Sequence, residues 1–225
     1  MDKVYSIAID GPAGAGKSTM ARRAAAELGF VYVDTGAIYR TVGYAVGKRG
    51  IDPADTEQID ALLPQLRVKL AWKDGVQHMY LDGADVSKKI RLPDVSSMAS
   101  KVSALPSVRA FLLDTQRSAA KTHSVVMDGR DIGTVVLPDA DVKIYLTASA
   151  EVRAKRRFLE LQEQGARDTY DEVLKDMIER DYRDMHREIA PLKQADDAVL
   201  LDTSDLTLEE SVVALLNIIR EKLTL

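Results

Sequence analysis

A glycine-rich segment near the N-terminus constrains this chain more than any other feature. It comprises Gly11, Pro12, Ala13, Gly14, Ala15, Gly16, Lys17, Ser18 and Thr19. An apolar run at residues 4–9 precedes it, and residues 17–28 carry apolar side chains at helical spacing. Glycines let such a loop turn tightly and aim its N–H groups at an oxyanion, and the helix start adds positive potential. The segment predicts a phosphate-binding loop in which Lys17 reaches the β and γ phosphates of a nucleotide and Ser18 binds Mg²⁺.

Two alternatives compete for this loop. The first is an ordinary glycine-rich turn between a strand and a helix, although the strand before and the helix after favour phosphate binding. The second is a dinucleotide-binding fold, since Asp34 stands near the end of the next apolar run, where a ribose-binding acid would lie. That pattern would need a third glycine at the position of Thr19, so it is disfavoured.

Short β-branched runs alternate with longer helical patterns along the chain. The predicted strands are residues 4–9, 31–33, 125–127, 142–146 and 199–201, and the predicted helices are 17–28, 106–121, 150–164, 170–187 and 208–223. This alternation is typical of an α/β fold with a buried parallel sheet. Capping boxes begin two helices, at Thr169 with Glu172 and at Thr207 with Glu210. Residues 64–101 read instead as an antiparallel insertion, because two apolar runs flank Lys73-Asp74-Gly75.

Composition narrows the class of protein. Hydrophobic residues make up 46% and charged residues 29% of 225 residues, as in a soluble globular chain. The formal net charge of −4 disfavours a nucleic-acid polymer as partner, and no apolar segment approaches the length of a membrane span. Without cysteine there is no disulfide or thiolate metal site, which fits a reducing compartment. We therefore expect a cytoplasmic enzyme or switch.

Clustered arginines favour a kinase over a nucleotide-hydrolysing switch. The chain lacks the Asn-Lys-x-Asp string of guanine-reading switches, and its arginines gather at Arg153, Arg156 and Arg157 and at Arg180 and Arg187. An alternative interpretation of these arginines is a solvent-exposed pair of helices whose charged side chains form surface salt bridges. Transfer to a phosphate acceptor, however, needs no deprotonated side chain, because the acceptor oxygen is already ionised; it needs cations that bring two polyanions together and exclude water.

Two further strings stand after predicted strands, where α/β enzymes keep their sites. The first runs from Asp34 to Arg40, and its alternative reading is a helix cap at Asp34 or Thr35. The second is Asp128-Gly129-Arg130-Asp131, whose alternative is a hairpin turn. In the functional reading, Asp128 lies near Mg²⁺, and an arginine and a carboxylate follow it toward the acceptor.

Together these strings resemble the bacterial cytidylate kinase family in its longer form. The resemblance rests on Gly-Pro-x-Gly-x-Gly-Lys-Ser-Thr, Asp-Thr-Gly-Ala-Ile-Tyr-Arg, Asp-Gly-Arg-Asp-Ile-Gly-Thr and Glu-Arg-Asp-x-Arg-Asp ahead of Ala-Pro-Leu, in order over nearly the whole chain. It implies ATP-dependent phosphorylation of CMP and dCMP, and a fold with a five-stranded parallel core, a nucleoside-monophosphate insertion and a helical lid. The implied boundaries are about 1–34, 104–150 and 190–225 for the core, 35–103 for the insertion and 151–189 for the lid.

The resemblance also implies roles for individual residues. Residues 11–19 would bind ATP, with Mg²⁺ held by Ser18 and Asp128. Lys17, Arg130, Arg153, Arg157 and Arg187 would act in catalysis. The acceptor phosphate would meet Thr35, Arg40, Arg130 and Arg187; the cytosine would meet Ser100, Arg109 and Asp131; and the ribose would meet Arg180 and Asp184. Some members have serine where this chain has Thr35, and the hydroxyl is kept. A monomer is expected, and a kinase for UMP, AMP or shikimate, or a switch with a protein partner, stay open as alternatives.

Overall fold

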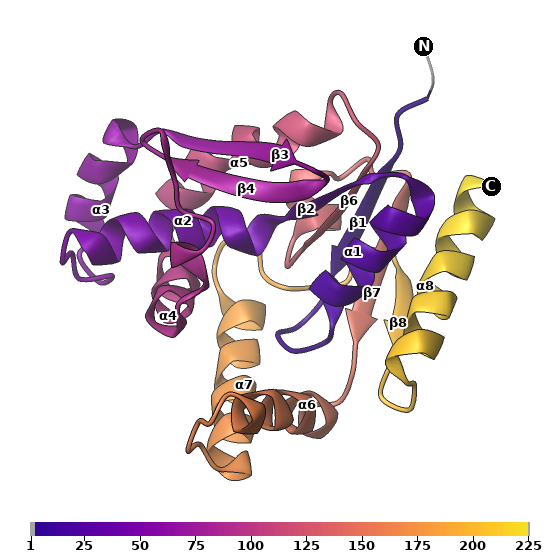
Figure 1. Ribbon diagram of the computed structural model, residues 1–225. Helices are drawn as coiled ribbons and strands as arrows, with labels where there is room; N and C mark the ends of the chain where they lie inside the picture. The colour runs from indigo at the N-terminus through magenta and orange to yellow at the C-terminus, as the bar shows by residue number, and fades with distance from the viewer. Residues whose placement is uncertain (1–2, 225) are drawn as a thin grey trace. The chain divides into compact units, whose positions relative to one another are not determined.

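A computed structural model describes residues 3–224, with the side chain of Pro93 left undescribed. The chain forms two compact units (Figure 1). The smaller comprises residues 3–4 and Val31–Ser124, and the larger comprises Tyr5–Phe30 and residues 125–224. None of the helices within residues 3–224 is long and apolar enough to cross a membrane.

The predicted α/β fold with a five-stranded parallel sheet is confirmed. The strand order is β2-β6-β1-β7-β8, with β1 at Ser6–Asp10, β2 at Val31–Asp34, β6 at Val125–Gly129, β7 at Val142–Thr147 and β8 at Val199–Asp202. The five predicted strands are therefore present, with ends shifted by one or two residues. β1 lies between β6 and β7 and is parallel to both, in a register that pairs Ile9 with Asp128 and with Ile144. This register brings the carboxyl end of β1, where the glycine-rich loop begins, next to the carboxyl end of β6.

Four strands of this sheet, β1, β6, β7 and β8, form the core of the larger unit, while β2 belongs to the smaller unit. Ile7, Ile9, Val126 and Ile144 are at most 1% exposed, and the consecutive burial of residues 7–9 and 125–127 shows that these strands are covered on both faces. Strands covered on both faces are uniformly apolar, which is why short β-branched runs predict them well.

The helices of the larger unit begin and end at the residues that their capping signals indicate. They are α1 (Lys17–Leu28), α6 (Ala150–Glu163), α7 (Tyr170–His186) and α8 (Leu208–Leu223), with a π-helical turn at Ile132–Val136. Both predicted capping boxes, at Thr169 and Thr207, are present. α1 packs against α8, while α6 and α7 form a pair with a small core of their own (Figure 1). In that core Phe158 and Tyr170 meet edge to face.

The smaller unit carries the predicted antiparallel sheet, but the predicted span of residues 64–101 is wrong at its C-terminal end, because the strands stop at Asp85 and residues 93–102 are helical. β3 (Val68–Lys73), β4 (Val76–Leu81) and β5 (Ala84–Asp85) form an antiparallel sheet. Four helices accompany the sheet: α2 (Thr35–Lys48), indicated only by the alternative of a helix cap at Asp34 or Thr35; α3 (Thr56–Leu62) and α4 (Pro93–Val102), which were not predicted; and α5 (Pro106–Ala120), which was. Short 3₁₀ turns lie at Leu63–Gln65 and Lys89–Arg91. α2 has three glycines and several β-branched residues, which lower helix propensity, so packing decides its conformation.

A glycine sets the closest approach between α2 and α4. A Cβ atom on Gly43 would lie 2.8 Å from the backbone nitrogen of Ala99 and 3.0 Å from its Cα. Since backbone atoms of a packed helix cannot yield cheaply, only glycine fits there. Gly47, one turn later, is exposed, and a Cβ on it would meet only the end of Met98 at 3.9 Å.

These two glycines form a matched pair for testing the packing. We expect Gly43→Ala to lower the free energy of unfolding by about 1–3 kcal/mol through steric conflict with α4. Gly47→Ala should raise it by up to about 1 kcal/mol, because alanine has the higher helix propensity. Urea unfolding of both variants beside the wild type measures the difference, and equal effects of the two substitutions would contradict the close approach.

Candidate functional site

The glycine-rich loop is held in one conformation by the strands beneath it. Gly11 has φ +150°, and a Cβ there would lie 1.9 Å from the carbonyl oxygen of Leu146 on β7, so no other residue fits. Gly16 has φ +84°, in the left-handed region, and caps α1. The conformation of the loop is therefore set by its glycines and by the backbone of β7, and the N-terminus of α1 lies at its end.

Lys17 is buried inside this loop. Its ammonium donates to the carbonyl oxygen of Pro12 at 2.6 Å, and the residue is 5% exposed. Burial, and after it the positive charge of Arg130, lower the pKa of Lys17 well below its usual value, while Asp128 and Asp10 oppose that shift. An incoming anion would relieve this electrostatic cost, which fits a lysine that binds phosphate.

The predicted metal-binding pair lies together. The Ser18 hydroxyl donates to a carboxylate oxygen of Asp128 at 2.8 Å, joining the start of α1 to the end of β6. One hydroxyl and one carboxylate are hard oxygen ligands, and Mg²⁺ commonly takes that number from protein and completes its shell with water and substrate phosphates. Among the described residues there is no cluster of three or more acidic or histidine side chains that would form a complete protein cage.

Ion pairs hold both predicted acceptor-site arginines of the larger unit, and a third ion pair holds the predicted catalytic residue Arg153. Arg130 Nε lies 2.9 Å from an oxygen of Asp184, and Arg187 Nη2 lies 3.7 Å from an oxygen of Asp131. Burial alone would raise the pKa of Asp184, but the charge and hydrogen bond of Arg130 hold it below its usual value. Burial, and then Arg130, lower the pKa of Arg180, whose buried Nε has no hydrogen-bond partner within residues 3–224. The third pair lies between α6 and α7.

That third pair involves the first of the clustered arginines. All three guanidinium nitrogens of Arg153 are engaged: Nε with the carbonyl oxygen of Ala148, Nη1 with that of Ala13 in the loop at 2.9 Å, and Nη2 with Asp181 at 2.6 Å. Arg153 is 4% exposed and thus ties the loop to α6 and α7.

The other two clustered arginines differ from Arg153 in their surroundings. Arg156 donates to the carbonyl oxygen of Thr203 at 2.8 Å, while the half-exposed Arg157 pairs, among the residues that the structure describes, with Glu160 of the same helix. Arg157 is therefore the arginine of this cluster with the most freedom to turn toward a ligand.

The smaller unit holds the remaining predicted residues. Asp34 caps α2 by accepting from the N–H of Ala37, which confirms the helix-cap alternative, and it also pairs with Arg40; a role of this string at the acceptor stays a prediction. Thr35, at the start of α2, is buried. Arg109 on α5 donates to the backbone carbonyl oxygen of Ser103. The Ser103 hydroxyl in turn donates to the backbone carbonyl oxygen of Ser100. The Arg109 guanidinium also lies over the ring of Tyr39, 5.4 Å from its centre.

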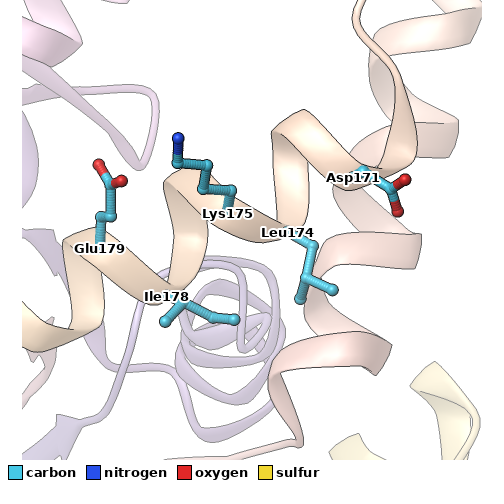
Figure 2. Close-up of a pocket in the computed structure, with 5 residues that line it drawn as sticks. All are labelled: Asp171, Leu174, Lys175, Ile178 and Glu179. Carbon is cyan, nitrogen blue, oxygen red and sulfur yellow. The ribbon is translucent and has the colours of Figure 1, made fainter.

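A hollow on α7 is unrelated to these residues. Its walls are Asp171, Leu174, Lys175, Ile178 and Glu179, and Figure 2 shows all five projecting from one helix. None of them is a predicted site residue, and the two apolar members offer no means of holding phosphate. The loop and its ion pairs, rather than this hollow, are the candidate active site.

Comparison with known proteins agrees with this geometry. A sequence profile described as cytidylate kinase matches residues 7–221. The chain belongs to the cytidylate kinase family. A cytidylate kinase of Lactobacillus johnsonii is 47% identical over 99% of this chain and 96% of its own length. One of Caldicellulosiruptor bescii is 50% identical, over 92% of each chain. Among solved structures, a shikimate kinase of Bacteroides thetaiotaomicron covers 99% of this chain and 100% of its own at 13% identity and a TM-score of 0.51, which supports the fold alone.

Sequence reasoning missed two buried acids in this cytidylate kinase family member, Asp181, which pairs with Arg153, and Asp10. Asp10 ends β1, is 5% exposed, and accepts the N–H groups of Ile132 and Gly133 at 2.7 Å each. It thereby fixes the first turn after Asp131, where the chain enters a π-helix. Its position directly before Gly11 was the only available signal, since its partners are more than 120 residues away.

Burial changes the titration of Asp10. Desolvation raises its pKa from 3.8 to about 6; the two N–H donors and Lys17 lower it, and Asp131 raises it. Because the folded state holds the proton more tightly than the unfolded state, acidification from pH 7 to about 4.5 adds to the free energy of unfolding through this group.

We expect this contribution to be visible against Asp10→Asn, which cannot titrate. The difference in free energy of unfolding between wild type and variant should shift in favour of the wild type by about 2 kcal/mol between pH 7 and about pH 4.5. Urea unfolding at both pH values measures it. A difference that stays constant with pH would mean that Asp10 titrates normally.

Proposed function

We propose that this chain catalyses ATP-dependent phosphorylation of CMP and dCMP to CDP and dCDP by direct in-line transfer, with Mg²⁺. The observation that carries the proposal is family membership over nearly the whole chain, combined with a preformed phosphate loop beside the Ser18–Asp128 pair. The family implies ATP and Mg²⁺, and the donor chemistry of Ser18 and Asp128 suits Mg²⁺. Cytoplasmic location, the monomeric state and the domain boundaries near 35–103 and 151–189 stay predictions.

On the donor side, residues 11–19 are proposed to bind the ATP phosphates. The loop's backbone N–H groups and the start of α1 would face the β phosphate, and Lys17 would leave Pro12 to contact the transferred group. Mg²⁺ held by Ser18 and Asp128 would neutralise charge on the phosphates. The conformation of the loop is fixed by Gly11 and Gly16, so little reorganisation is needed on binding.

On the acceptor side, arginines replace a general base. The acceptor phosphate oxygen is ionised near neutral pH, so the enzyme has to offset repulsion between two polyanions instead of removing a proton. Arg130 and Arg187 from the larger unit and Thr35 and Arg40 from the smaller are the proposed phosphate contacts. Arg157 is the proposed lid arginine, and the catalytic role predicted for Arg153 would act through the loop that it holds.

The proposed ribose and base contacts follow the family pattern. Arg180 and Asp184 would contact the ribose, and the buried unpaired Nε of Arg180 supplies a donor that needs an acceptor. Ser100, Arg109 and Asp131 would read cytosine. Its amino group can donate to the Asp131 carboxylate, and its ring nitrogen and carbonyl can accept from Arg109. Uracil would place a carbonyl oxygen against the carboxylate.

A panel of nucleoside monophosphates with ATP tests the activity. ADP release should be stimulated by CMP and dCMP and far less by UMP, AMP or shikimate. Stimulation by one of the other acceptors alone would reassign the substrate. Indifference to every acceptor, with slow hydrolysis of ATP, would indicate a switch that acts on a protein partner.

Asp131→Asn tests how the base is read. The amide keeps the size of the side chain but can present either N–H₂ or C=O to the base. The preference for CMP over UMP in kcat/KM should shrink by about 1–3 kcal/mol, the range typical of one base-edge contact. Thermal melts serve as the control for folding: equal losses with both substrates and a lower Tm would give Asp131 a structural role only.

A further inference from the structure

One carboxylate oxygen in the smaller unit serves two arginines. Asp34 Oδ2 lies 2.9 Å from Nη2 of Arg40 and 3.0 Å from Nη2 of Arg91. The Asp34 side chain is 6% exposed, so this is a nearly buried acceptor. Arg40 lies on α2, while Arg91 ends the 3₁₀ turn at Lys89–Arg91 and belongs to none of the strings that point to phosphate chemistry.

Asp34 is held rigidly enough to position both arginines. Its other carboxylate oxygen accepts the N–H of Ala37 at 2.8 Å, as the cap of α2. The Gln77 side chain from β4 accepts the Asp34 N–H at 2.7 Å and donates to its carbonyl oxygen at 3.1 Å. Hydrogen bonds with Ala37 and Gln77 thus hold both the carboxylate and the backbone of Asp34 in place. Asp34 in turn holds the two guanidinium groups in a fixed position.

The charges of this group do not balance. Two guanidinium groups share a single carboxylate, which leaves a net charge of about +1. In addition, the buried Nε of Arg40 has no hydrogen-bond partner within the described residues. The Arg91 side chain is 54% exposed, so part of its guanidinium can still meet a ligand. Excess positive charge with an unused N–H donor is the chemistry that recognises an oxyanion.

We propose that Arg91 is a further substrate-binding residue, which together with Arg40 contacts the phosphate of the acceptor nucleotide. The inference rests on the proposed function, since it takes the acceptor to be a nucleoside monophosphate. Asp34 is the positioning residue that holds the two guanidinium groups together. A second arginine on an already satisfied carboxylate oxygen adds little to stability at a half-exposed position, whereas it adds a charge-assisted donor for phosphate.

The test separates phosphate binding from base binding. KM for CMP is measured at saturating ATP, and cytidine, which lacks the phosphate, is titrated as a competitive inhibitor in the same assay. We expect Arg91→Gln to raise the KM for CMP by at least about tenfold, as loss of a charged hydrogen bond would, and to leave the Ki of cytidine and the KM of ATP unchanged. Arg49→Gln is the matched control, because Arg49 is a partly exposed arginine of the same unit paired with Asp82; it should change none of these constants.

Two results would overturn the proposal: an unchanged KM for CMP, or a Ki for cytidine that rises in parallel with it. Melting temperatures establish that the variants fold. If Arg91→Gln fails to fold, Arg91→Lys is assayed in its place in the same way. Failure of the proposed function would look different. The wild type would then release no ADP in response to CMP, and this is measured before any variant.

Discussion

The register of β1 between β6 and β7 is the constraint on which the larger unit depends. It pairs Ile9 with Asp128, so the strand that ends in the phosphate loop and the strand that ends in Asp128 stop side by side. Their proximity lets Ser18 reach Asp128 and lets Asp10 reach the N–H groups of the next turn. On the other side, the backbone of β7 approaches so closely that residue 11 has to be glycine. A one-residue slip of β1 would separate all of these groups at once.

Buried charge is the second common element of the site. Lys17, Asp10 and Arg153 are each at most 5% exposed, and each is held by backbone groups as well as by charges. Burying such groups costs free energy, and the shifted pKa values of Lys17 and Asp10 express that cost. In return, the groups need little rearrangement when charge develops nearby, which is the main source of catalysis in phosphoryl transfer. The burial of apolar side chains in the sheet thus offsets the free energy that it costs to bury these charged groups in and beside the loop.

The sequence predicted those features of the structure that depend on residues close together in the chain. The glycine-rich loop, the five strands and both capping boxes depend on neighbours in sequence, and the structure confirms them. α2 was indicated only by a possible cap at Asp34 or Thr35, because its glycines and β-branched residues argue against a helix until α4 packs against Gly43. Asp10 was missed for a similar reason, as its partners follow a strand more than 120 residues away. Arg153 was predicted as a positively charged residue of the site, but only the structure shows that each of its three guanidinium nitrogens bonds to another group of the protein.

Pairing of arginines with acids gives the two units different electrostatic characters. In the larger unit, Arg130 pairs with Asp184, Arg187 with Asp131 and Arg153 with Asp181. Arg180 and Arg187 also lie within electrostatic reach of Asp184, so a ligand must compete with these carboxylates or use donors that remain, such as Nε of Arg180. At Asp34 the ratio is two to one, and the excess charge exists before any ligand arrives. An anion drawn first to the uncompensated site gains attraction without breaking an ion pair. If the proposed contacts hold, the group around Asp34 would suit capture of the acceptor, and the paired arginines would suit the later step in which charge develops.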